Sequence, residues 1–106
     1  MVKIHGNWCG PNWTDGKKQT ARKHLLAGGK FNGPCIDKLD CACRTHDKEC
    51  SGPRGCTYKA DNNLIDRADR ILANPLNFVV NPVMYAKARL VRDTFEVVRF
   101  TRYDAP

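Results

Sequence analysis

The stretch Cys41-Ala42-Cys43-Arg44-Thr45-His46-Asp47-Lys48-Glu49-Cys50 decides how this chain folds, because it combines a helical pattern with two ionisable side chains. One face of the expected helix carries five residues spaced three or four apart: Ile36, Leu39, Cys43, His46 and Cys50. An imidazole on the packed face of a helix is costly to bury unless another group satisfies it. The stretch therefore predicts a helix and, opposite His46, a polar partner.

A second helix supplies a candidate for that partner. We expect the first helix to run from about Ile36 to Cys50 and the second from about Thr57 to Ala73, because Ser51-Gly52-Pro53 and Asn74-Pro75 end them. The apolar face of the second helix holds Tyr58, Leu64, Ile65, Ala68, Ile71 and Leu72.

Asp61 lies on this same apolar face, three and four residues before Leu64 and Ile65. The connection between the helices is short, so we expect them to pack antiparallel and to bring Asp61 to His46. An imidazole N–H that donates to a buried carboxylate offsets both burial costs. A purely structural His–Asp pair is the alternative that these two residues leave open.

The remaining segments carry weaker signals. Glycine, proline and asparagine in residues 6–18 predict a loop, and Thr20–Ala27 predicts a short helix before a second loop over 28–35. Asn81-Pro82 is expected to start a third helix that continues to Leu90. Val, Phe and Arg in Thr94–Tyr103 favour a strand.

Length and composition limit the fold. The 106 residues suit a single domain, with a core over about 6–73 and a small C-terminal extension over 74–106. All six cysteines lie between Cys9 and Cys56, which suits a disulfide framework. The net charge of +7 favours an anionic partner, either nucleic acid or an anionic membrane, although a solvated basic face would look the same.

Asp47 points about 100° around the helix from His46, toward a neighbouring groove. A hard cation such as Ca²⁺ needs six to eight oxygen ligands, several of which backbone carbonyls can supply. The loop Trp8-Cys9-Gly10-Pro11-Asn12 suits that task, because glycine and proline favour a tight turn with exposed carbonyls.

These residues together resemble a known family. Trp8-Cys9-Gly10, followed by Asp40 and Ala42-Cys43-Arg44-Thr45-His46-Asp47, is similar to the calcium loop and catalytic helix of small phospholipases A2, and Cys43–Asp47 resembles the bee-venom type. Gly10-Pro11 and Lys59-Ala60-Asp61-Asn62-Asn63-Leu64-Ile65 also resemble the phospholipase domain of parvovirus capsid proteins. The resemblance covers roughly residues 6–72.

The resemblance implies a mainly α fold, in which two antiparallel disulfide-braced helices carry the site and a calcium-binding loop precedes them. It implies calcium-dependent hydrolysis of the sn-2 ester of glycerophospholipids at a membrane surface, which releases fatty acid and lysophospholipid. His46 would be the general base and Asp61 would hold it. Ca²⁺ and the Gly10 N–H would stabilise the oxyanion. The calcium ligands would be the Asp47 carboxylate and the carbonyls of Trp8, Gly10 and Asn12.

Several residues depart from the family pattern. Asn12 stands where many secreted relatives have a second glycine, and Thr20–Ala27 is an insertion expected to shape the membrane-binding face. Cys50 lies on the His46 face, where many relatives use a tyrosine to reach the equivalent of Asp61. A Cys9–Cys43 disulfide would pin the loop to the first helix. Two further candidate pairs are Cys35–Cys41 and Cys50–Cys56, among many possible connectivities.

The expected partner is an anionic phospholipid membrane, bound by a monomer through Trp8, Trp13, Lys17 and Lys18. Nucleic acid is not expected, because no aromatic stacking platform is recognisable. The protein is expected to be secreted, or associated with a virion if it belongs to a capsid protein. Two alternatives remain: a zinc site of Cys43, His46 and Cys50, and a catalytically inactive phospholipase-like binder.

Overall fold

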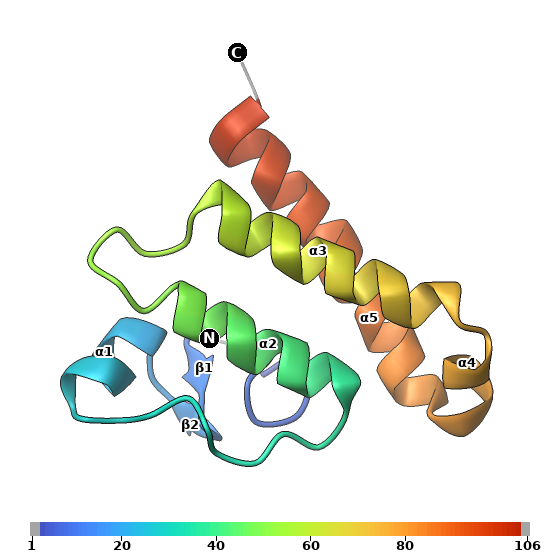
Figure 1. Ribbon diagram of the computed structural model, residues 1–106, viewed down its shortest axis with the longest axis horizontal. Coiled ribbons are helices and arrows are strands. Elements are labelled where there is room, and N and C mark those ends of the chain that lie inside the picture. Colours follow the sequence, from blue (N-terminus) through green and yellow to red (C-terminus); the bar gives the residue numbers. More distant parts are fainter. Residues whose placement is uncertain (1–2, 105–106) are drawn as a thin grey trace.

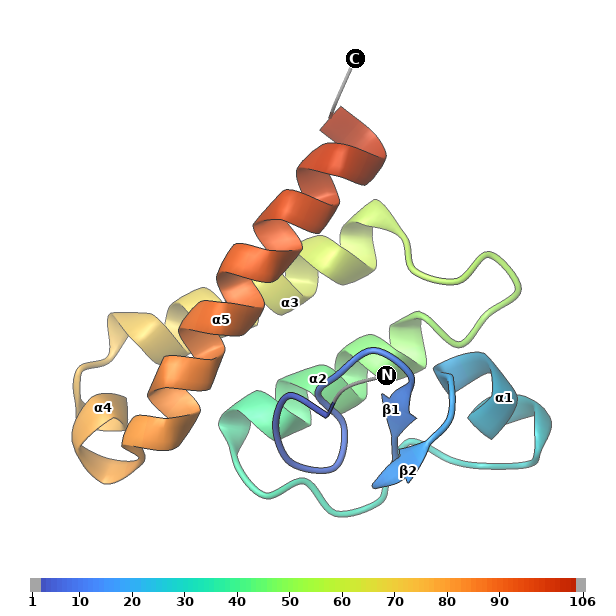
Figure 2. The same cartoon turned by 180° about the vertical axis from the view of Figure 1, so that it is seen from behind.

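The computed structural model describes residues 3–104 and is mainly helical (Figure 1). Its elements are β1 (Trp13–Thr14), β2 (Lys17–Lys18), α1 (Ala21–Leu26), α2 (Lys38–Glu49), α3 (Tyr58–Ala73), α4 (Leu76–Val80), α5 (Pro82–Arg99) and the π-helical turn η1 (Phe100–Asp104). The long helix α5 crosses behind α3, and α2 lies between α3 and the N-terminal segment (Figures 1 and 2). No helix of residues 3–104 is both long and apolar enough to cross a membrane.

Helix α2 is the first helix predicted from the sequence, but it begins at Lys38 and not at Ile36. The Asp37 side chain caps it by accepting from the backbone N–H of Asp40 at 2.9 Å, and Cys50 is its C-terminal cap. Ile36 precedes the cap, so it lies outside the helix and is 64% exposed. Its expected place on the buried face is therefore wrong, whereas Leu39, Cys43, His46 and Cys50 are all buried.

Helix α3 begins one residue later than expected because Thr57 is its N-terminal cap, accepting from the Ala60 N–H at 3.2 Å. Its buried residues are Ala60, Asp61, Leu64, Ile65, Ala68 and Ile71. Tyr58, expected on the same face, is exposed in the first turn. The buried stripe therefore includes Asp61, as the pattern predicted.

Residues 76–104 are helical apart from Asn81, and the expected strand over Thr94–Tyr103 is wrong. Helix α5 buries Met84, Ala88 and Val91 and half-buries Phe95, a spacing of four, three and four residues that belongs to one helix face. Of the valines that favoured a strand, Val97 is 63% exposed, whereas Val98 follows Phe95 by three residues and is half-buried. Packing against α3 thus overrides local strand propensity.

The hydrophobic core extends beyond the expected range of 6–73. Its buried members are Trp8, Cys9, Leu39, Ala42, Cys43, Leu64, Ile71, Met84, Ala88 and Val91. Three of these belong to α5, so residues 82–99 contribute to the core.

The N-terminal loop is held by a buried carboxylate of α2. Asp40 has 0% exposure and accepts from three backbone N–H groups, those of Asn7, Trp8 and Ile36, at 2.9 to 3.1 Å. Gly6 adopts φ +60° directly against this carboxylate, where a Cβ would collide with it. The residues expected to form only a loop, 6–18, also contain the short β1–β2 hairpin.

Three disulfides brace the N-terminal half. They join Cys9 to Cys43, Cys35 to Cys41 and Cys50 to Cys56, the same pairs proposed from the sequence, and no cysteine is free. Cys9–Cys43 lies in the core and ties the N-terminal loop to α2. The other two close short loops at the two ends of α2.

Asp40→Asn should lower the free energy of unfolding by roughly 3 kcal/mol. The new amide nitrogen is itself a donor, so it could no longer accept the backbone N–H groups that now donate to one of the carboxylate oxygens. Urea unfolding followed by circular dichroism measures this change. Asp66→Asn, an exposed change on α3, is the control and should have little effect. Equal stability of the two variants would show that Asp40 does not anchor the loop.

Candidate active site

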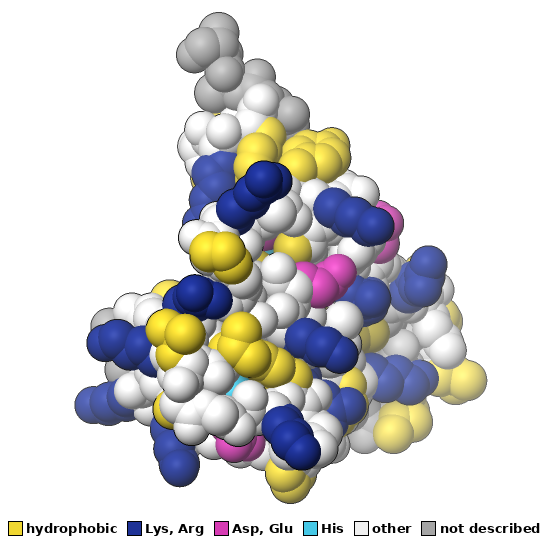
Figure 3. Space-filling view, turned by 60° about the vertical axis from the view of Figure 1, so that its left-hand side comes forward, with side chains coloured by type: hydrophobic (Ala, Val, Ile, Leu, Met, Phe, Trp, Pro, Cys, Tyr) yellow, Lys and Arg dark blue, Asp and Glu magenta, His cyan; other side chains and the backbone are white. Residues whose placement is uncertain are grey.

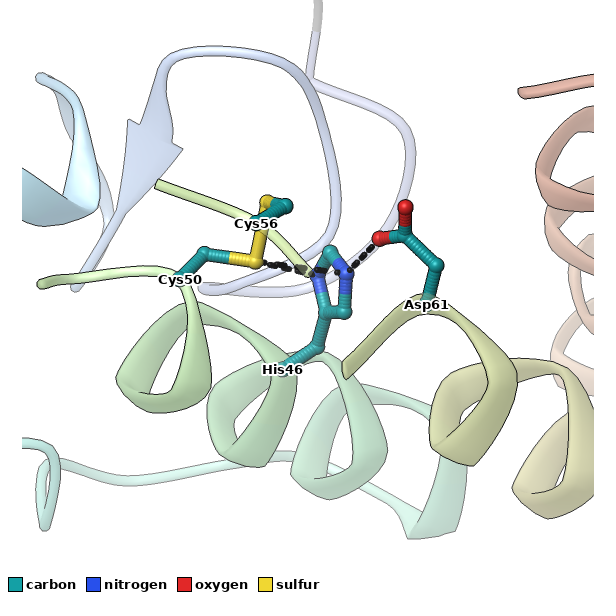
Figure 4. Close-up of side chains that lie close together, drawn as sticks. All are labelled: His46, Cys50, Cys56 and Asp61. Carbon is teal, nitrogen blue, oxygen red and sulfur yellow. Dashed lines mark hydrogen bonds and ion pairs between the residues drawn. A yellow bond between two sulfur atoms is a disulfide. The ribbon is translucent and has the colours of Figure 1, made fainter. Parts of the chain in front are cut away.

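His46 and Asp61 meet across α2 and α3. The Nε2 atom of His46 lies 2.8 Å from Oδ1 of Asp61 (Figure 4), and the two residues are 7% and 0% exposed. A carboxylate can only accept, so in a neutral His46 ring this contact requires the tautomer whose Nε2–H group donates a hydrogen bond to Asp61. The neutral ring then keeps a lone pair on Nδ1, which is the form a general base requires.

Asp61 also receives donors that the sequence did not indicate. Its Oδ2 atom accepts from the Tyr103 hydroxyl at 3.2 Å and from Nη1 of Arg102 at 3.3 Å, both in the η1 turn. The C-terminal segment therefore completes the environment of the carboxylate. These side chains are 41 and 42 residues from Asp61 in the sequence, and no periodic pattern in the sequence predicts the contact.

Two other groups contact the His46 ring. Phe95 of α5 packs edge-on against it with ring centroids 4.9 Å apart. The Cys50 Sγ lies 3.4 Å from Nε2 and 3.8 Å from Nδ1, within the Cys50–Cys56 disulfide (Figure 4). Together with Asp61, these groups hold the ring in one orientation.

A cavity of about 540 Å³ opens beside this pair. The N-terminal loop, the start of α1, the end of α2, the loop before α3 and the C-terminal half of α5 form its walls. Its lining includes the apolar side chains of Ile4, Leu64, Val91, Phe95 and Val98. Mainly apolar walls with a few convergent polar groups are typical of a ligand site.

All of the expected calcium ligands line this cavity, namely Trp8, Gly10, Asn12 and Asp47. Gly10 and Asn12 have φ values of +142° and +54°, so Asn12 adopts a left-handed conformation that glycine favours and asparagine tolerates. The Gly10 carbonyl accepts from the Trp13 N–H and the Asn12 carbonyl from the Gln19 N–H. Each carbonyl keeps a second lone pair that can bind a cation.

Asp47 is a half-buried carboxylate without a cationic partner among residues 3–104. Burial raises its pKa to about 8, opposed in part by the hydrogen bond from the Thr14 hydroxyl at 3.3 Å and supported by the nearby charge of Asp40. Among these residues, therefore, no positively charged side chain stabilises the ionised form of Asp47.

Two expectations about site residues need correction. The Trp8 side chain is 1% exposed and donates its indole N–H to the Pro34 carbonyl, so it packs in the core and cannot contact a membrane. Cys43 is bonded to Cys9 and therefore offers no thiolate to a zinc site with His46 and Cys50. Trp13 is half-buried, Lys17 and Lys18 are exposed, and none of these three lines the cavity.

Comparison with known proteins adds no relative: the chain matches no protein-family model, no curated protein and no solved structure.

Tyr103→Phe should lower the free energy of unfolding by about 1 kcal/mol, because it removes one hydrogen bond to a buried carboxylate and leaves the ring in place. Chemical denaturation at neutral pH measures the loss. Tyr58→Phe is a matched control, because Tyr58 packs edge-on against Tyr103 and is exposed. If both changes have the same effect, the Tyr103 hydroxyl does not support Asp61.

Asp47→Asn should make metal-free stability less dependent on pH. With a pKa of about 8 in the folded chain and 3.8 as the ordinary value, Asp47 favours folding at low pH and loses that contribution as pH rises through about 8. We expect the free energy of unfolding of the variant to equal that of the unaltered protein near pH 4. At higher pH it should be greater by on the order of 2 kcal/mol. Urea unfolding in chelator measures this, and a variant that is less stable at pH 9 would contradict it.

Proposed function

We propose that this protein is a calcium-dependent phospholipase A2-type hydrolase, which cleaves the sn-2 ester of glycerophospholipids at a membrane surface. The observation that carries the proposal is the buried His46–Asp61 hydrogen bond, in which His46 lines a largely apolar cavity that Asp47 also lines. The motif resemblance of residues 6–72 supports the same reaction.

In this proposal His46 is the general base. Asp61 accepts a hydrogen bond from the Nε2–H group, so Nδ1 takes a proton from the water that attacks the ester carbonyl. The same imidazolium then returns the proton to the departing glycerol oxygen, which yields a fatty acid and a lysophospholipid. Tyr103 and Arg102 hold Asp61 through its other oxygen, so they are positioning residues.

The residues beside His46 fit a calcium ion. Asp47 lacks a cationic partner among the described residues, and a divalent cation would favour its ionised form. The carbonyls of Trp8, Gly10 and Asn12 would supply further oxygen ligands. When bound, Ca²⁺ would polarise the ester carbonyl and stabilise negative charge on its oxygen.

The surface around the cavity suits an anionic phospholipid membrane. Figure 3 shows the side that carries α1 and the loop between α2 and α3, where hydrophobic side chains are surrounded by Lys and Arg and few acidic groups are visible. The exposed apolar residues on α1 are Leu25 and Leu26, and Arg22 of the same helix lines the cavity. Apolar contact combined with basic charge is what an anionic membrane binds.

Three disulfides support a location in an oxidising compartment, outside the cell or on a virion.

The decisive experiment incubates the protein with phosphatidylcholine vesicles containing phosphatidylglycerol, with Ca²⁺ or with a chelator, and measures fatty-acid release. Release should require Ca²⁺, and His46→Gln should reduce it by roughly 10²- to 10⁴-fold, the usual contribution of a general base.

His5→Gln is the matched control. The buried His5 pairs with the half-buried Asp37, with Nε2 2.6 Å from Oδ2, and lies outside the cavity lining. It should therefore retain activity. Absence of release from folded protein that binds Ca²⁺ would instead favour an inactive phospholipase-like binder, and equal losses in the two histidine variants would refute the role of His46.

A further inference from the structure

The Cys50–Cys56 disulfide lies against the His46–Asp61 pair. One ligand atom from each of these four residues lies within 4.8 Å of the other three. Figure 4 shows the sulfurs on one side of the imidazole ring and Asp61 on the other. In the oxidised protein the sulfurs are bonded to each other, so they offer no thiolate to a metal.

We propose that reduction of Cys50–Cys56 creates a zinc site from Cys50, Cys56, His46 and Asp61. Tetrahedral Zn²⁺ binds sulfur at about 2.3 Å and nitrogen or oxygen at about 2.0 to 2.2 Å, so its ligand atoms lie about 3.3 to 3.8 Å apart. The distance from Cys50 Sγ to His46 Nε2 is already 3.4 Å, and the distance from Nε2 to Asp61 Oδ1 is 2.8 Å. Small shifts of these side chains are enough once the sulfur–sulfur bond is broken.

The reaction balances with a dithiol as the reductant. The dithiol transfers two electrons and two protons to the disulfide, becomes a disulfide itself, and leaves two cysteine thiols. Zn²⁺ then displaces both thiol protons and takes the place of the Nε2 proton, so that His46 becomes its Nδ1–H tautomer and two protons are released in all. Both cysteines line the cavity, which is a route for a small dithiol.

Groups around the cluster suit a metal. Asp61 would bind through Oδ1, while its Oδ2 keeps Tyr103 and Arg102 as donors, an outer-shell arrangement that commonly orients a metal-binding carboxylate. The charges of two thiolates and the Asp61 carboxylate are balanced by Zn²⁺ and Arg102. Phe95 shields one edge of the imidazole ring.

The site has a consequence that rests on the proposed function. A metal on Nε2 leaves the proton of the neutral ring on Nδ1, so His46 would no longer accept a proton from water. Reduction with zinc would thus turn the hydrolase off. Metal binding itself is independent of that activity.

The test titrates the dithiol-treated, desalted full chain with Co²⁺ under anaerobic conditions and follows thiolate-to-cobalt charge-transfer absorption, then displaces Co²⁺ with Zn²⁺. Mass mapping after alkylation identifies preparations in which Cys50–Cys56 is open and Cys9–Cys43 is intact. We expect one bound metal per chain after reduction and none at this cluster before it.

Ligand variants locate the metal. His46→Gln and Asp61→Asn keep every thiol and should weaken binding at least about tenfold, the loss that even an outer-shell change produces. Cys50→Ser with Cys56→Ser should abolish binding. Matched controls are His5→Gln and the pair Cys35→Ser with Cys41→Ser, which should bind normally. Unchanged binding in His46→Gln, or no binding by chain with Cys50–Cys56 open, would overturn the proposal.

A single variant removes the need for a reductant. Cys50→Ser leaves the Cys56 thiol beside His46 and Asp61 while the other two disulfides stay closed, so it should bind Co²⁺ weakly with one thiolate bond. Adding His46→Gln to this variant should remove that binding. A charge-transfer band that persists in the double variant would mean that Cys56 binds metal without His46, contrary to the proposal.

Discussion

The burial of the Asp61 carboxylate is the constraint on which the candidate site depends. A carboxylate with 0% exposure must be supplied with hydrogen-bond donors, and this one draws them from α2 and from the C-terminal turn. His46, Tyr103 and Arg102 therefore meet around one side chain of α3. The requirement to satisfy Asp61 links segments that are far apart in the sequence, and it also fixes the orientation of the His46 ring.

A second buried carboxylate, Asp40, organises the N-terminal end of α2. Asp40 accepts hydrogen bonds from three backbone N–H groups and so shapes the N-terminal loop. The Cys9–Cys43 disulfide ties the same loop to the core. The loop residues Gly10 and Asn12 thereby reach the cavity that contains Asp47. One helix thus carries both the histidine of the candidate site and the anchor of its neighbouring loop, and a small domain holds this arrangement with disulfides.

The sequence predicted the structure correctly where the spacing of hydrophobic residues or the residues at a helix end are sufficient to indicate a helix. Thr57 and Ser51-Gly52-Pro53 bound the helices that hold His46 and Asp61, and hydrophobic spacing placed both residues on inner faces. It failed for Thr94–Tyr103, because strand propensity is weak beside the packing of Met84, Ala88, Val91 and Phe95 against the core. It also placed Ile36 and Trp8 wrongly, since burial of a single side chain depends on neighbours distant in the chain.

By itself, the sequence determined a mainly helical, disulfide-rich chain with an inward histidine on one helix and an inward aspartate on the next. The tertiary structure alone decided that Tyr103 and Arg102 complete Asp61, that α5 closes the cavity, and that the Cys50–Cys56 sulfurs lie against the His46 ring. The physical reason is that periodicity and capping act over a few residues, whereas a buried charge is satisfied by whichever donors the folded chain brings within hydrogen-bonding distance.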